Sequence, residues 1–260
     1  MKVYAFIFAR GNSKGLSGKN IRLLGGHPLL AHSIMVAQQV AGISKVFVST
    51  DSDEIAAVAE AYQAIVIRRP DELATDTAPE WLAWRHAINH LRAQGHVFDV
   101  FVSLPATSPL RSVEDVELCM ASLDPNTDVV VTVTPASRSP YFNMVVRDEQ
   151  GASTLVCSGN GVHRRQDAPA IYDMTTVAYV TSPEFILNNE RIFSGRVRSV
   201  VVPRERAVDI DDIYDFKMAE FFLAEKGTDY VEKIKPFWSR VLVVCSELDW
   251  YSAWLSKVHP

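Results

Sequence analysis

The chain has 260 residues, enough for one large α/β domain or for a core domain with a smaller lobe. Its hydrophobic content of 48% is that of a globular protein, and its net charge of −5 argues against a general nucleic-acid binder, which needs a basic surface. No stretch approaches the roughly 20 apolar residues of a membrane-spanning helix, and the first residues do not resemble a signal peptide. Three scattered cysteines fit free thiols in a reducing cytoplasm, so we expect a cytoplasmic protein without a membrane or nucleic-acid partner.

The first half of the chain alternates between short apolar runs and amphipathic stretches. The apolar runs are continuous rather than alternating in polarity, which predicts buried strands at 3–9, 45–50, 64–69, 97–104 and 128–134. The stretches between them predict helices at about 28–41, 52–62, 78–94 and 112–123. Strand–helix alternation of this length implies right-handed crossovers and a mainly parallel sheet.

Two of these helices carry start signals. Thr50 and Asp51 precede the acidic pair at 53 and 54, and Ser112 stands three residues before Asp115. The second arrangement matches a capping box, in which the two side chains bond each other's backbone amides.

The alternation breaks between Pro135 and about Thr175, where Pro, Ser, Gly and scattered charges surround two weak strand signals, at 141–147 and 153–158. This is too long for an ordinary loop, so we expect a functional excursion or a small β lobe. Strands are then predicted at 176–181 and 197–203, and helices from Pro183 and from about 212 to 225. The end of the chain has one more strand-like run and several Trp residues.

A basic, glycine-rich loop follows the first strand, with cations at 10, 14 and 19, glycines at 11, 15 and 18, and no acidic residue. Ligands bind beyond the carboxyl ends of parallel strands, and glycines let backbone amides approach an anion. A Walker A motif would need Gly at 13 and Ser or Thr at 20, where this chain has Ser13 and Asn20, and a GxGxxG pattern is absent. The loop alone therefore fits either an anion site or a solvated basic turn.

The loop "ARGNSKGLSGKN" resembles the signature of the acylneuraminate cytidylyltransferases, also called CMP-sialic acid or CMP-nonulosonic acid synthetases. Further similar motifs follow in order: "VSTDSDEIAAVA" (48–59), "RRPDELATDTA" (68–78), "ATSPLR" (106–111), "RRQD" (164–167) and "VDIDDIYDF" (208–216). The resemblance implies a cytidylyltransferase domain over 1–226, followed by an extension at 227–260 of unknown role. It implies a three-layer, Rossmann-like α/β nucleotidyltransferase fold, with a 135–175 lobe that serves dimerisation and sugar binding.

The same resemblance implies a reaction: CMP passes from CTP to a keto-sugar acid and pyrophosphate leaves, with Mg²⁺ or Mn²⁺ as cofactor and a homodimer as the working form. It assigns the triphosphate and nucleoside to Arg10, Gly11, Ser13, Lys14, Lys19, Asn20, Arg69, Thr77 and Ala78. Within that set, Lys19 would meet the α-phosphate and Arg69 the cytosine edge, since a guanidinium offers donors in a fixed geometry. The residues implied in catalysis are Arg10, Lys14, Lys19 and Asp211.

Asp209 and Asp211 are the candidate metal ligands. They stand two apart, so in an extended chain both carboxylates share one side, and hard oxygens suit Mg²⁺. The residues alone also allow an acid cluster at a helix start, since Asp211 and Asp212 precede a predicted helix.

The sugar acid is assigned by the resemblance to Arg165, with Arg164 as the alternative for its carboxylate, and to Thr175. The chain departs from the family here. Many sialic acid enzymes have a Gln where this chain has Pro105, and the family commonly has Asn at the position of Thr175. The sugar therefore stays open among sialic, legionaminic, pseudaminic, Kdn-like and eight-carbon acids.

Two other functions are compatible with parts of the pattern. An Asp-x-Asp pair also holds the metal of glycosyltransferases that use nucleotide-sugars, although the basic loop would then have no role. A non-catalytic nucleotide-binding protein of the same fold is the second alternative.

Some other side chains are not expected to take part in function. His86 and His90 lie one turn apart but lack the glutamate of a zinc protease, and we expect Trp81, Trp84 and Cys119 to be structural.

Overall fold

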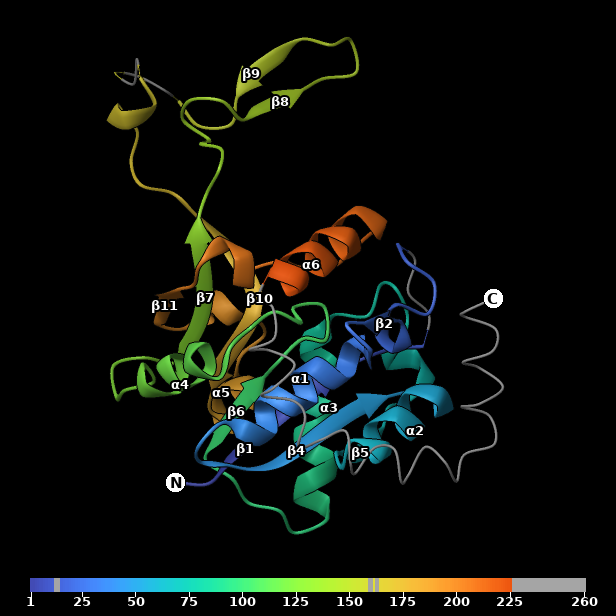
Figure 1. Ribbon diagram of the computed structural model, residues 1–260. Helices are drawn as coiled ribbons and strands as arrows, with labels where there is room; N and C mark the ends of the chain where they lie inside the picture. The colour runs from blue at the N-terminus through green and yellow to red at the C-terminus, as the bar shows by residue number, and fades with distance from the viewer. Residues whose placement is uncertain (12–14, 159–160, 162–163, 226–260) are drawn as a thin grey trace, which may run out of the picture.

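The computed structural model describes residues 1–11, 15–158, 161 and 164–225, and its centre is a seven-stranded sheet (Figure 1). Its strand order is β11-β7-β10-β6-β1-β4-β5. The strands are β1 (Val3–Phe8), β4 (Ile43–Thr50), β5 (Ile65–Arg68), β6 (Val100–Ser103), β7 (Val129–Pro135), β10 (Tyr172–Thr181) and β11 (Val197–Val201). In this sheet β10 runs antiparallel to both neighbours, and every other neighbouring pair is parallel. The predicted mainly parallel sheet is confirmed.

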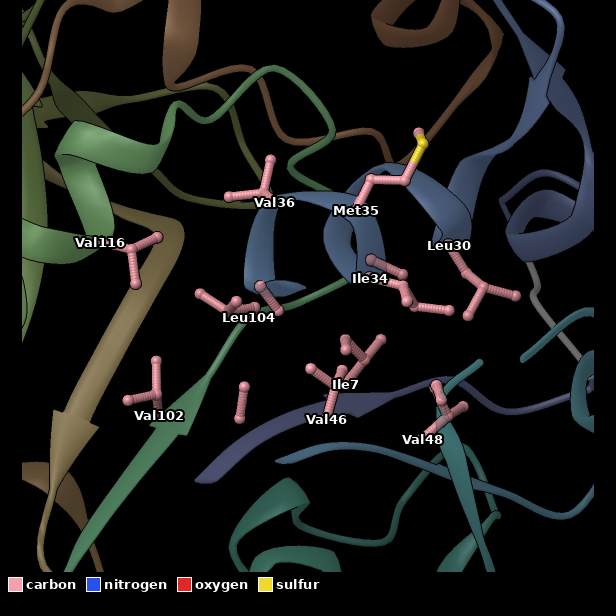
Figure 2. Packing of buried hydrophobic residues seen from close by; sticks show 14 of the residues in the cluster. Ile7, Leu30, Ile34, Met35, Val36, Val46, Val48, Val102, Leu104 and Val116 are labelled. Atoms are coloured by element: carbon pink, nitrogen blue, oxygen red, sulfur yellow. The ribbon is translucent and has the colours of Figure 1, made fainter. Parts of the chain in front are cut away.

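Helices cover both faces of the sheet, which gives the expected three layers. The helices α1 (Leu29–Gln39), α2 (Asp53–Ala61) and α4 (Val113–Ala121) pack on one face. Figure 2 shows this contact, in which Leu30 and Ile34 of α1 lie toward Ile7, Val46 and Val48 of the sheet. The helices α3 (Glu80–Ala93) and α5 (Pro183–Asn188) cover the other face, whose core is largely aromatic.

The helix starts follow the sequence signals in one case and differ in the other. The capping box of α4 is confirmed: the Asp115 amide donates to Ser112 Oγ at 3.3 Å, and the Ser112 amide donates to Asp115 Oδ2 at 2.9 Å. Helix α2 is capped by Ser52, which accepts from the Ile55 amide, and not by Thr50 or Asp51. The carboxylate of Asp51 is thereby left to accept from the Gly11 amide, at 3.0 Å.

The excursion between β7 and β10 projects from the sheet (Figure 1). Its two weak strand signals form the short antiparallel strands β8 (Val145–Arg147) and β9 (Ser153–Leu155), and a 3-10 helix, η3, spans Arg165–Asp167. Large apolar side chains of this lobe are exposed in the single chain, namely Phe142, Met144, Val145, Val146, Leu155 and Val156. The expected small β lobe is present, with much of its apolar surface uncovered.

A third apolar cluster lies beside the carboxyl edge of the sheet. It joins the hairpin β2 (Leu23–Leu24) and β3 (His27–Pro28), which the sequence did not predict, to the segment 208–210 and to α6 (Ile213–Glu225). Short 3-10 helices complete the described chain: η1 (Lys19–Ile21), η2 (Asp71–Leu73), η4 (Ile192–Ser194) and η5 (Arg204–Arg206). No described helix has the length and apolar character that crossing a membrane requires. The predicted strand-like run and the extension at 227–260 lie outside the described residues.

Candidate active site

The ends of β4 and β5 fix a buried arginine at the carboxyl edge of the sheet. Arg69 is 9% exposed; its Nη2 donates to the Ser49 carbonyl at 2.6 Å and its Nε to Ser49 Oγ at 3.3 Å. The guanidinium also lies over the Phe8 ring, 5.8 Å from its centroid. Burial lowers the pKa of Arg69, and the charges of Asp51 and Glu80 oppose that shift. Arg69 is therefore a rigid cation at the site, whereas the adjacent Arg68 is exposed and pairs with Asp53 on the surface.

The described part of the basic loop is tied to its neighbours. Arg10 Nη1 pairs with Asp76 at 2.5 Å, which joins the loop to the 70–79 segment that carries exposed Thr77 and half-buried Ala78. Asn20 is 6% exposed and its Nδ2 donates to the Arg10 carbonyl at 3.0 Å, so it braces the loop backbone. Ser13 and Lys14 lie outside the described residues.

Lys19 connects this loop to the aspartate pair. Its side chain is buried, and Nζ donates to the Ile210 carbonyl and lies 3.4 Å from Asp211 Oδ1. A Cβ added to Gly15 would lie 2.2 Å from the Asp211 carbonyl oxygen, so the loop backbone packs directly on the same segment. The fold thus brings together a predicted phosphate-binding lysine and a predicted metal ligand that are far apart in the sequence.

The two predicted metal ligands lie in different surroundings. The Asp211 side chain is 81% exposed beside Lys19, whereas Asp209 is half-buried and its Oδ1 is buried without a hydrogen-bond partner. The start of α6 is capped by Asp212, which accepts from the Tyr214 amide at 2.7 Å and the Asp215 amide at 3.0 Å. The alternative reading, an acid cluster at the start of a helix, therefore accounts for Asp212. It does not account for the carboxylates of Asp209 and Asp211.

These carboxylates suit a divalent cation. A buried carboxylate oxygen without a donor is costly unless a cation compensates it. Among the described residues, no group of three or more His, Cys, Asp and Glu could hold a metal ion. Mg²⁺ commonly takes one or two carboxylates from the protein and further oxygens from substrate phosphates and water.

The motif "ATSPLR" is a structural clamp beside the site. Arg111 is 3% exposed, donates to the carbonyls of Val177 and Pro105 and to Ser33 Oγ, and so ties the end of β6 to β10 and α1. Its burial lowers the pKa of Arg111 to about 9. Because the guanidinium is fully engaged in the fold, this motif positions the sheet edge.

The residues predicted for the sugar acid are not gathered at this edge within one chain. Thr175 is 6% exposed, and its hydroxyl donates to Thr132 Oγ1 at 2.7 Å inside the sheet. Arg164 is exposed in the lobe and pairs with Asp167, with Nη2 2.8 Å from Oδ1. Arg165 begins η3 in the same lobe, and its side chain lies outside what the structure describes.

The edge of the sheet therefore combines a basic glycine loop, a buried arginine and a pair of aspartates. A family model described as "Cytidylyltransferase" matches residues 4–222. The chain belongs to the cytidylyltransferase family.

Two of three similar proteins are named as enzymes of sugar acids. The chain is 34% identical over 231 residues to the CMP-N,N'-diacetyllegionaminic acid synthase of Campylobacter jejuni, a match that covers 87% of this chain and 97% of that protein. It is 33% identical, with the same two coverages, to the post-translational flagellin modification protein B of Campylobacter coli. It is 30% identical to the N-acylneuraminate cytidylyltransferase of Escherichia coli, over 95% of this chain and 58% of that longer protein.

Solved structures show the same fold. A CMP:2-keto-3-deoxy-manno-octonic acid synthetase complexed with CTP superposes with a TM-score of 0.66 at 17% identity, over 87% of this chain and 100% of that one. A 4-diphosphocytidyl-2C-methyl-D-erythritol synthase superposes with a TM-score of 0.62 at 12% identity, over 86% and 100%. The predicted α/β nucleotidyltransferase fold is confirmed.

Two ionisable residues of this cytidylyltransferase's site were missed in the sequence. Glu80 begins α3 and accepts from Trp84 Nε1 at 3.2 Å; it reaches solvent, but the protein around its carboxyl group disfavours the charge and raises its pKa. Burial and the charges of Glu80 and Asp209 raise the pKa of Tyr179 to about 12. An acid in the first turn of a helix is commonplace, so the sequence carried no signal for Glu80.

Proposed function

We propose that this protein transfers CMP from CTP to the anomeric hydroxyl of a keto-sugar acid, a sialic acid or a related nonulosonic acid, and releases pyrophosphate. The contact between Lys19 and Asp211 supports this proposal, because the lysine that we assign to the phosphates lies beside a carboxylate that we assign to the metal. The names of the relatives support the substrate class. We assign the reaction to residues 1–226 and, because CTP is a cytoplasmic nucleotide, to the cytoplasm.

Catalysis of this reaction is largely positioning and charge stabilisation. The sugar hydroxyl attacks the α-phosphorus in line; the new O–P bond forms as the bond to pyrophosphate breaks, and the hydroxyl proton passes to water. Arg10, Lys14 and the amides near Gly11 and Ser13 would hold the triphosphate, with Lys19 at the α-phosphate. Asp76 and Asp211, which pair with Arg10 and Lys19 in the free protein, would yield these cations to the phosphates.

The remaining groups would complete the site. Mg²⁺ or Mn²⁺ held by Asp209 and Asp211 supplies, when bound, neutralisation of the phosphate charge. Arg69 would face the cytosine, beside Thr77 and Ala78, with Asn20 keeping the loop in shape. Arg165, or else Arg164, would pair with the sugar carboxylate from the lobe of a second copy.

Pyrophosphate release tests the proposal against its alternatives. The enzyme, CTP and Mg²⁺ are incubated with a panel of eight- and nine-carbon keto-sugar acids. We expect release that depends on the sugar acid, with a legionaminic or sialic acid among the active compounds. Turnover of a nucleotide-sugar without use of CTP would indicate a glycosyltransferase, and CTP binding without release for every sugar would indicate a non-catalytic protein.

Gly15 offers a test of the loop. Gly15→Ala places a Cβ against the Asp211 carbonyl, so the loop must move. An overlap of this kind costs roughly 1–3 kcal/mol, so the affinity for CTP is expected to fall roughly tenfold or more. Gly18→Ala is the matched control. Its φ of +63° strains an alanine, but a Cβ there meets no atom within 4 Å. Titration calorimetry with CTP should show the larger loss for Gly15→Ala, and equal losses would contradict the packing argument.

The exposed lobe leads us to expect a homodimer in which each lobe packs on its partner. Val146→Asp replaces a side chain that is 60% exposed in the single chain, so it should leave the fold intact while disrupting an interface. Light scattering at low micromolar concentration should then show a dimer for the natural chain and a monomer of much lower activity for the variant. Val97→Asp, at a site 74% exposed in the connection between α3 and β6, is the control. A stable, active monomer of the natural chain would contradict the shared site.

A further inference from the structure

The segment that carries the two candidate metal ligands has little regular structure of its own. Residues 207–212, all of them described, lie between η5 and α6 outside any helix or strand. The far end of the segment is tied to α6, because Asp215 Oδ2 accepts from the amides of Asp211 and Asp212, at 3.0 and 3.1 Å. The position of Asp209 therefore depends on contacts with parts of the chain that are distant in sequence.

Arg206 anchors the near end of this segment. Its Nε donates to Asp115 Oδ2 at 2.8 Å, and its Nη2 donates to Asp115 Oδ1 at 2.9 Å. The Asp115 side chain is 2% exposed and is already fixed, because its Oδ2 also accepts from the Ser112 amide in the capping box of α4. Two hydrogen bonds from a planar guanidinium set both the distance and the angle between the partners. Arg206 thus holds the chain, three residues before Asp209, against the start of α4.

Ile210 is the second anchor, and it stands between the two aspartates. Its amide donates to the Thr107 carbonyl at 2.9 Å, and its carbonyl accepts from Lys19 Nζ. Its side chain is fully buried, in the apolar cluster that also contains Leu110. Thr107 and Leu110 belong to the connection between β6 and α4, which Arg111 clamps through the Pro105 carbonyl. One stretch of chain, 107–115, therefore holds both residue 206 and residue 210.

We propose that the ion pair of Arg206 and Asp115 positions the metal site. By fixing residue 206 against α4, the pair sets the direction of the Asp209 carboxylate and thereby the affinity for a divalent cation. Mg²⁺ demands near-octahedral geometry, so a small displacement of one carboxylate weakens its binding. The inference rests on the proposed function, because it takes Asp209 and Asp211 as the metal ligands. Arg206 and Asp115 are positioning residues, with no contact to the cation or to the substrates.

The test measures binding of Mn²⁺ in the presence of CTP, by electron paramagnetic resonance, for the natural chain and two variants of Arg206. In Arg206→Ala the affinity for Mn²⁺ is expected to fall roughly tenfold or more, the lower end of the loss that follows removal of groups that orient metal ligands. Arg206→Lys keeps a charge opposite the buried carboxylate but cannot form both hydrogen bonds in one plane, so its affinity should lie between the two. Binding of CTP without metal should change little in either variant. Should Arg206→Ala fail to fold, Arg206→Lys decides the test, because it leaves no buried charge unpaired.

Arg196 and Asp128 provide the matched control. Arg196 also donates two hydrogen bonds to one aspartate, both at 3.0 Å, but this pair lies at the amino ends of β7 and β11, on the opposite edge of the sheet. Arg196→Ala should keep the natural affinity for Mn²⁺, whatever it does to thermal stability. Kinetics give a second readout: Arg206→Lys should need more Mg²⁺ than the natural chain for half-maximal activity and should approach the natural kcat when Mg²⁺ is saturating.

The possible outcomes separate this inference from the proposed function. If the natural chain binds Mn²⁺ and the folded variants of Arg206 bind it equally well, the ion pair supports only the fold. The same holds if Arg206→Ala weakens the binding of Mn²⁺ and of metal-free CTP by the same factor. In both cases the inference is overturned and the proposed function stands. If the natural chain binds no Mn²⁺ in the presence of CTP, the metal site of the proposed function fails, and the inference fails with it.

Discussion

Replacing Lys19 by alanine is expected to lower kcat/KM for CMP transfer by roughly 10²-fold or more, a loss of about 3 kcal/mol of transition-state stabilisation. The ammonium group is buried beside the Ile210 carbonyl and the Asp211 carboxylate, where its charge is screened less than on the surface. Charge that develops between the α-phosphate and the leaving pyrophosphate would fall within its reach. Steady-state kinetics with saturating sugar acid and varied CTP measures the effect.

Two controls separate this loss from a general effect on the fold. Lys2→Ala removes an exposed lysine before β1, at the opposite end of the strand from the loop, and should leave kcat/KM unchanged. Thermal unfolding of Lys19→Ala shows whether the loss of its bond to Ile210 has disturbed the fold. A folded Lys19→Ala variant with natural turnover would remove Lys19 from the catalytic set.

Metal dependence is the second large effect. Activity is expected to require Mg²⁺ or Mn²⁺ and to vanish with EDTA. Asp211→Asn should stay folded but lose roughly 10²-fold or more in kcat, because a neutral amide binds a hard cation more weakly than a carboxylate does. Asp209→Asn should behave similarly, since its buried Oδ1 has no other partner. Binding of Mn²⁺ in the presence of CTP, followed by electron paramagnetic resonance, gives a readout that is independent of turnover.

Asp212 provides the matched control for that experiment. It is the neighbouring acid and caps α6, and asparagine caps helices as well as aspartate does. Asp212→Asn should therefore keep both stability and metal dependence. If Asp211→Asn works normally, or if EDTA has no effect, the acids at 209–212 serve only the start of the helix and the proposed mechanism is wrong.

The local pattern of the sequence was sufficient to predict most helices and strands and to identify the basic glycine loop. Continuous apolar runs such as 3–9 and 128–134 became β1 and β7 because burial on both faces of a sheet demands apolar side chains throughout. The capping box at Ser112 could be predicted because both of its hydrogen bonds join residues three apart in the sequence. The basic glycine loop was recognisable because its charges and glycines stand in one short stretch, and six motifs in the same order then indicated the family.

Only the tertiary structure decided how single charged side chains are used. Arg68 and Arg69 are neighbours in the chain, yet one is a surface cation and the other is buried, because alternate residues at a strand end face opposite sides. Asp211 likewise meets Lys19 and Gly15, which are far from it in the chain. Burial and hydrogen bonding of a charge depend on contacts between distant residues, and local periodicity carries no information about them.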